Sequence, residues 1–230
     1  MKSLETVKNL LKPLITRKFW QMMGDYVGIG KQKKSDIISD SETLAQFIDS
    51  RASHVAQTSL YGYLRTRSGT RFPELFENPE ILMSINIAKW HIWLACVSDL
   101  SVFAGQCLQQ SEKFDESAIK SLMPRALARV FDKIGAPGEA GGDFISAREH
   151  VIRRIGSCDW SLQRDDDTVF SQSPPALYYW APIADELKER DEEIVKNSVR
   201  FRWIEIRRSA RHLLDFKALA NSLSTEDPAA

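Results

Sequence analysis

The chain has 230 residues, 43% of them hydrophobic and 27% charged, which is the usual composition of a globular protein. Lysine and arginine together number 31, and so do aspartate and glutamate, so the net charge is zero. Nucleic-acid-binding proteins usually carry a basic excess, because neutralising phosphates supplies most of their affinity. We therefore expect no nucleic-acid partner.

The N-terminal segment, residues 1–38, is basic and mixes charges among its leucines. It predicts a short helix over residues 2–11 that Pro13 ends. The segment lacks the unbroken apolar run of a secretory signal. Three widely spaced cysteines, Cys96, Cys107 and Cys158, are typical of free thiols in a reducing compartment. We therefore expect a cytoplasmic protein.

A strong helical pattern follows, which Ser39, Asp40 or Ser41 can cap and Gly69 ends. One face carries a stripe of mostly small residues: Ala45, Ala52, Ala56, Ser59 and Tyr63. The opposite side carries His54, Tyr61 and Arg65. Such a cluster can bind an anionic ligand, since arginine offers two parallel donors to a carboxylate or phosphate. It can equally be a solvated face.

The most apolar stretch, residues 84–105, lies in a predicted helix over about 79–110, with Asn78 as N-cap and Pro79 in its first turn. Lys89 and Asp99 would each cost about 2.5–3.5 kcal/mol near the centre of a bilayer, so we interpret this helix as a buried core rather than a membrane span. A second stripe of small residues is predicted to pack against the first; it comprises Ser84, Ala88, His91, Ala95 and Ser98, and Gly105 extends it. His91 is either a buried acid/base or ligand, or a core histidine hydrogen-bonded across a helix pair.

Two further helices are predicted, one over 115–135 that is kinked or divided near Pro124, and a short one that begins at Phe144. Residues 161–175 read as irregular, with a solvated acidic turn at Asp165, Asp166 and Asp167. No part of the chain shows the alternation that is typical of strands.

One long C-terminal helix is predicted after Pro182, preceded by an aromatic loop of Tyr178, Tyr179 and Trp180. One side of this helix is basic through Arg200, Arg207 and Arg211, and its additional apolar edge consists of Ile194, Phe201 and Ile204. A basic amphipathic helix can lie on an anionic membrane or enter a partner's groove. Residues 1–222 are thus predicted to form a single helical domain, and residues 223–230 a disordered tail.

Catalytic patterns are missing from the sequence. There is no GxSxG elbow of an α/β hydrolase. Cys158 and His150 do not make a convincing nucleophile and base, and Glu149 and His150 are adjacent, so they cannot supply the ligand spacing of a di-metal bundle. We expect no bound metal and no cofactor.

Three stretches carry a resemblance to a known family. They are RASHVAQTSLYGYLRTRSGTRFPELF, SINIAKWHIWLACVSDLSVFAG and YYWAPIADELKERDEEIVKNSVRFRW. Together they resemble an uncharacterised proteobacterial family, some members of which carry the name esterase. The similarity spans most of the chain. It implies a bacterial, all-helical, single-domain protein, and it transfers no catalytic motif.

The sequence therefore predicts an all-α, irregular helical bundle around a buried central helix. The leading functional prediction is a non-enzymatic adaptor or assembly factor that binds a protein partner through Tyr178, Tyr179 and Trp180 and through Arg200, Arg207 and Arg211. A first alternative is a hydrolase of ester bonds with a pocket near His54, Tyr61, Arg65 and His91. A second alternative is peripheral contact with an anionic membrane through the basic C-terminal helix.

Overall fold

The computed structural model describes residues 37–162, 164 and 166–226, all of which belong to one compact unit. These residues form helices and no strand, and their only extended pairing is a single parallel bridge between Ile38 and Leu214. The prediction of an all-α helical bundle is confirmed. The helix predicted over residues 2–11 lies outside the described residues.

Helix α2 (Ser41–Ser68) begins and ends at local sequence signals. The Asp40 carboxylate accepts a hydrogen bond of 2.8 Å from the backbone N–H of Thr43, and the Thr43 hydroxyl accepts one of 3.1 Å from the backbone N–H of Asp40. This reciprocal pair satisfies donors that a helix N-terminus otherwise leaves unpaired. Gly69 ends the helix at a φ of 54°, a conformation that favours glycine, and the 3₁₀ segment η2 (Gly69–Phe76) follows.

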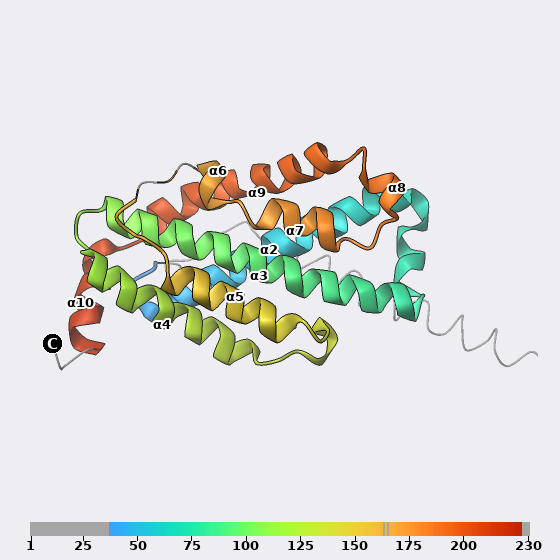
Figure 1. The fold of residues 1–230 in the computed structure, drawn as a ribbon. Coiled ribbons are helices and arrows are strands. Elements are labelled where there is room, and N and C mark those ends of the chain that lie inside the picture. The colour runs from blue at the N-terminus through green and yellow to red at the C-terminus, as the bar shows by residue number, and fades with distance from the viewer. Residues whose placement is uncertain (1–36, 163, 165, 227–230) are drawn as a thin grey trace, which may run out of the picture. The chain divides into compact units, whose positions relative to one another are not determined.

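Helix α3 (Pro79–Gln110) is the buried central helix, with the predicted bounds and with Asn78 as its N-cap. Every residue from Cys96 to Leu108 is buried, so this part of the helix is covered all round. Figure 1 shows α3 in the middle of the unit, and it packs against α2, α4, α5, α7 and α9. Among the described residues it is the one helix long and apolar enough to cross a membrane, and a core helix covered on all sides has the same composition.

Helix α4 (Glu116–Ile134) runs through Pro124 as one helix, so of the two predicted alternatives, a kink or a division, the division does not occur. Pro124 is exposed, and the carbonyl that loses its N–H partner can therefore be hydrated. The short segment η3 (Gly138–Ala140) and helix α5 (Phe144–Gly156) follow. The predicted irregular region contains a single helical turn, α6 (Asp166–Val169).

The prediction of one long C-terminal helix is wrong. After Pro182 the described residues form three helices, α8 (Asp185–Lys188), α9 (Glu192–Leu213) and α10 (Phe216–Glu226), and a separate short helix, α7 (Ser173–Trp180), precedes this proline. Ile38 interrupts the helix at Leu214, because its N–H donates to the Leu213 carbonyl over 2.8 Å and its carbonyl accepts from the Asp215 N–H over 3.0 Å. Helix α10 also continues to Glu226, into the segment predicted as a disordered tail.

Helices α2 and α3 pack along each other, and three polar side chains of the two small-residue stripes bind groups outside this helix pair. On α2, the Ser59 hydroxyl accepts from Arg202 of α9 over 3.0 Å, and the Tyr63 hydroxyl donates to Asp191 over 2.9 Å. On α3, Ser98 accepts from Arg154 of α5. Ser59 and Tyr63 of α2 therefore face α9, and Ser98 of α3 faces α5.

Candidate functional site

An open groove of about 640 Å³ lies between α3, α5 and α7. Its apolar lining includes Leu94 and Ala95 of α3, Val151 of α5, and Pro175 and Ala176 of α7. Its polar lining consists of His91, Ser98, Asp143, Ser146, His150, Arg153 and Gln172. The combination of an apolar centre with scattered polar groups is typical of binding sites.

Aromatic side chains form one side of this groove. The rings of His91 and Trp180 are stacked, with centroids 3.7 Å apart and planes 13° from parallel. Trp180 in turn meets Tyr179 edge to face at 5.1 Å. The Tyr179 side chain is 72% exposed, which is unusual for a large aromatic residue held in a fixed arrangement. His91, Tyr179 and Trp180 thus form the aromatic side of the groove.

Burial determines the protonation state of His91. Burial lowers the pKa of this imidazole, while the charge of Asp143 and a hydrogen bond to the Ala140 backbone act in the opposite direction. The ring is therefore neutral at pH 7, as a core histidine would be. Of the two interpretations of His91, the structure favours the packed and hydrogen-bonded core residue.

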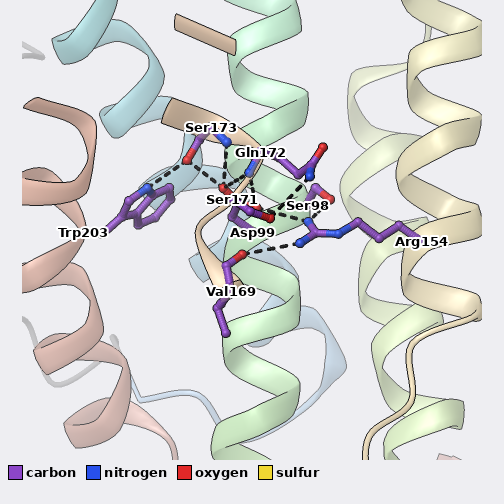
Figure 2. Close-up of polar contacts among 8 residues, drawn as sticks. All are labelled: Ser98, Asp99, Arg154, Val169, Ser171, Gln172, Ser173 and Trp203. Carbon is purple, nitrogen blue, oxygen red and sulfur yellow. Dashed lines mark hydrogen bonds and ion pairs between the residues drawn. The ribbon is translucent and has the colours of Figure 1, made fainter. Parts of the chain in front are cut away.

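Beneath the groove lies the Asp99 cluster, defined as Ser98, Asp99, Arg154, Gln172, Ser173 and Trp203 (Figure 2). The Asp99 carboxylate, on α3, is completely buried. It accepts hydrogen bonds from the Ser173 N–H and hydroxyl over 2.7 Å each and from the Gln172 N–H over 3.2 Å. Arg154 of α5 donates to it over 3.1 Å and to Ser98 over 2.6 Å. The cluster also includes α9, because Trp203 donates to the Ser173 hydroxyl over 3.0 Å, so four helices meet in it.

The electrostatics of Asp99 follow from its burial. Burial raises the pKa of its carboxyl from 3.8 to about 6, although the hydrogen bonds from Ser173 and Gln172 and the charge of Arg154 lower it. The carboxylate is inaccessible and its oxygens are already occupied by donors. It therefore positions α7, and with it the aromatic side of the groove, rather than acting on a ligand.

The four residues predicted for a hydrolase pocket do not line this groove together. His91 lines it, whereas His54, Tyr61 and Arg65 do not. His54 is half-buried near Arg202 and Arg51, which help burial to lower its pKa. Tyr61 is buried with its ring 6.2 Å from that of Phe76, and Arg65 is exposed.

The residues predicted for partner binding divide between two helices. Tyr178, Tyr179 and Trp180 belong to α7, so the prediction of an aromatic loop is wrong: Pro174 and Pro175 suit the first helical turn, and Asp99 accepts from the N–H groups there. Arg200, Arg207 and Arg211 belong to α9. Arg200 is exposed and donates to Asn197, while Arg207 and Arg211 lie over the rings of Phe170 and Phe103.

Cysteine and metal chemistry find little support in the described part of the chain. No group of three or more His, Cys, Asp or Glu side chains there is arranged to hold a metal ion. Burial raises the pKa of the Cys96, Cys107 and Cys158 thiols, which keeps them protonated and weakly nucleophilic at pH 7.

Fold and site together define an all-α helical bundle with an open surface groove over a buried polar cluster. Comparison of the chain with known proteins gave no matching family model, no similar curated protein and no similar solved structure. The sequence indicated the aromatic residues of the groove, but not the Asp99 cluster. The one sequence signal for that cluster was Asp99, a carboxylate within the most apolar predicted helix. A charge buried in such a helix needs hydrogen-bonding partners, but the sequence does not say which residues supply them.

Proposed function

We propose that the protein is a non-enzymatic adaptor or assembly factor that binds a segment of a partner protein in the groove between α3, α5 and α7. The observation that carries this proposal is Tyr179, a side chain 72% exposed at the groove and braced by Trp180. Exposed, rigid aromatic residues are the side chains on which protein interfaces most depend, because they bury a large area and lose little entropy.

The shape of the groove favours a protein segment over a small molecule. Small-molecule pockets enclose most of the ligand's surface, whereas this groove is open to solvent. Apolar side chains at its centre can receive one or two large side chains of the partner. His150 and Arg153, which are exposed at its edge, can hydrogen-bond the partner's backbone or acidic groups.

The hydrogen bonds of the groove also favour binding over hydrolysis. A hydroxyl nucleophile must lie within hydrogen-bond reach of its base. Here Ser98 accepts from Arg154, and Ser146 donates to the Asp143 carbonyl over 2.9 Å. Neither hydroxyl is directed at His91, whose ring is stacked on Trp180.

Selection from a random peptide library displayed on phage, with the full chain as target, tests the proposal. We expect selected peptides to lose affinity by tenfold or more when Tyr179→Ala removes the exposed ring, a cost of about 1.4 kcal/mol or more. Ala176→Trp, which fills the groove, should abolish binding. Phe201→Ala is the matched control, because Phe201 is 74% exposed but lies on α9.

Circular dichroism and thermal unfolding of each variant separate a local effect from misfolding. If the library yields no binder, or if selected peptides bind Tyr179→Ala and Ala176→Trp as tightly as the wild type, the proposal is wrong. Loss of binding with the Phe201→Ala control would move the site from the groove to α9.

A further inference from the structure

The outward face of α9 carries a row of exposed residues with a regular spacing. Its members lie alternately three and four positions apart along the helix: Ile194, Asn197, Phe201, Ile204, Arg208 and Arg211. All six residues are exposed. The buried side of the helix, which includes Val199 and Trp203, packs with α7 and α2. A row with this alternation, which we call the α9 seam, is the pattern by which two helices pack side by side.

The α9 seam is apolar at its centre and carries opposite charges at its two ends. Phe201 and Ile204 form the centre and are 74% and 42% exposed, so burying them against a partner is favourable. Arg208 and Arg211 lie at the C-terminal end of the seam. Glu193 is exposed in the first turn of the helix, next to the first residue of the seam. The charge therefore changes from negative to positive along α9.

We infer that α9 pairs with α9 of a second copy of the chain, with the two helices antiparallel about a two-fold axis that passes between Phe201 and Ile204. Phe201 of each copy then packs against Ile204 of the other, which removes both side chains from water. Asn197 of each copy faces Arg208 of the other in the next layer of the seam. The seam thus complements itself, as a two-fold contact between identical chains requires.

Charge complementarity at the ends selects this orientation. Antiparallel pairing brings Glu193 of each copy beside Arg211 of the other, so opposite charges meet at both ends of the contact. Parallel pairing would bring arginine against arginine and glutamate against glutamate. Arg211 also lies 5.2 Å from the centre of the buried Phe103 ring, which limits the movement of its guanidinium group.

One edge of the contact is unfavourable. Arg200 of each copy comes near Arg207 of the other, and these like charges oppose the pairing. The seam is also short, because residues 194–211 span about 26 Å of helix at 1.5 Å per residue. We therefore expect a dimer that dissociates reversibly at micromolar concentrations rather than a permanent one.

The composition of the seam favours a helix over a membrane surface. A helix that lies on an anionic bilayer needs a continuous apolar side with basic residues around it. Here Asn197 interrupts the apolar residues, and anionic headgroups would repel Glu193. Helix α9 runs along the outside of the bundle (Figure 1), where a second bundle can approach it.

The α9 seam is separate from the groove between α3, α5 and α7, so dimerisation goes beyond the adaptor function. A dimer carries two copies of the groove. A partner with two binding segments would therefore be held more tightly by the dimer than by a single chain.

Sedimentation equilibrium of the full chain tests the inference. Over a range from about 1 to 500 µM, in which weak contacts of this kind dissociate, the weight-average mass should rise from 26.2 kDa toward twice that value. Circular dichroism of every variant confirms that it is folded.

A substitution at the centre of the seam assigns the contact to α9. Phe201→Ala should raise the dissociation constant of the dimer by about 30-fold or more, because each dimer loses two rings from the middle of its interface. Tyr179→Ala is the matched control, since it removes a ring that is 72% exposed but lies on α7, and dimerisation should not change. The two variants exchange roles in the binding of groove peptides, so failure of one proposal leaves the other in place.

A charge exchange tests the antiparallel orientation. Glu193→Arg and Arg211→Glu should each raise the dissociation constant by about tenfold, because each dimer has two such pairs and each pair becomes one of like charges. The double variant restores opposite charges across the two-fold axis, and its dissociation constant should return to within about threefold of the wild-type value.

Three results would overturn the inference. One is a mass that stays at 26.2 kDa at every concentration; if that monomer floats with phosphatidylglycerol vesicles, the outward face of α9 belongs to a membrane. A second is a dimer that Phe201→Ala leaves unchanged, which would place the interface elsewhere. The third is a folded double charge variant that dimerises no better than either single variant, which would exclude the antiparallel pairing.

Discussion

At the scale of single residues, Gly105 shows why the core helix needs a glycine. A Cβ atom at this position would lie 2.2 Å from Cζ3 and 2.6 Å from Cη2 of Trp160. The indole ring is 1% exposed and therefore cannot move into solvent. Glycine allows the ring to lie directly against the α3 backbone.

Gly105→Ala should therefore destabilise the protein, although alanine normally stabilises a helix. We expect a loss of about 2 kcal/mol in the free energy of unfolding, because overpacking outweighs helix propensity. Gly156→Ala is the matched control: a Cβ there meets no atom within 4 Å, and stability should rise by about 0.5 kcal/mol. Guanidinium denaturation followed by circular dichroism measures both. A stable Gly105→Ala variant would contradict the packing described.

The sequence predicted part of this contact. Helical spacing placed small residues together on α3, and small residues do allow close approach. The pattern could not say what approaches, and the partner at Gly105 is an indole from the segment after α5 rather than a neighbouring helix backbone. Side-chain size is a local property, whereas the identity of the neighbour depends on the whole fold.

At the scale of elements, α7 depends on another helix for its N-terminus. A helix of eight residues is unstable by itself, and Gln172 at its N-cap makes no side-chain capping bond. Asp99 takes that role, because it accepts from the N–H groups of Gln172 and Ser173. The aromatic side of the groove therefore depends on a carboxylate buried in α3.

Asp99→Asn should cost about 3 kcal/mol of unfolding free energy at pH 7, because the amide cannot accept from all the same donors and Arg154 loses its counter-charge. Asp49→Asn is the matched control. Asp49 pairs with Lys133 over 2.9 Å, but that lysine side chain is 66% exposed, and we expect a loss of no more than about 0.5 kcal/mol. Equal denaturation midpoints for the two variants would rule out the anchoring role of Asp99.

Comparison of the caps shows what the sequence can predict about elements. The side chains of Asp40 and Asn78 accept from backbone N–H groups that lie only three and two residues further along the chain. Both caps were therefore evident from the sequence. Asp99 caps a helix whose N–H groups lie 73 and 74 residues further along. The break between α9 and α10 was also missed, because at Leu214 the competing hydrogen-bond partner is Ile38, from the other end of the described chain.

At the scale of the whole helical unit, the Asp99 cluster joins α3, α5, α7 and α9. The groove lies on one side of α7, and α9 with its outward apolar face packs against α7. A change in the cluster therefore affects the support of both proposed surfaces. The global stability of the unit should respond to the protonation of this one carboxyl.

The raised pKa of Asp99 predicts that this carboxyl stabilises the folded protein more at pH 5 than at pH 7. Between about pH 4 and pH 6 the folded protein holds a proton on this carboxyl that the unfolded chain has released, so stability from this group falls as the pH rises. Wild type should therefore gain about 1 kcal/mol relative to Asp99→Asn on going from pH 7 to pH 5.

The difference between the two proteins is the quantity to measure, because His91 acts in the opposite direction. The pKa of His91 is lowered by burial, and a histidine of this kind destabilises the folded state as the pH falls below 6.5. Both proteins contain His91, so its contribution cancels in the difference. Urea denaturation at pH 5 and pH 7 gives the two values, and Asp49→Asn should follow the wild type. If the gap between wild type and Asp99→Asn is the same at both pH values, Asp99 is not the titrating group.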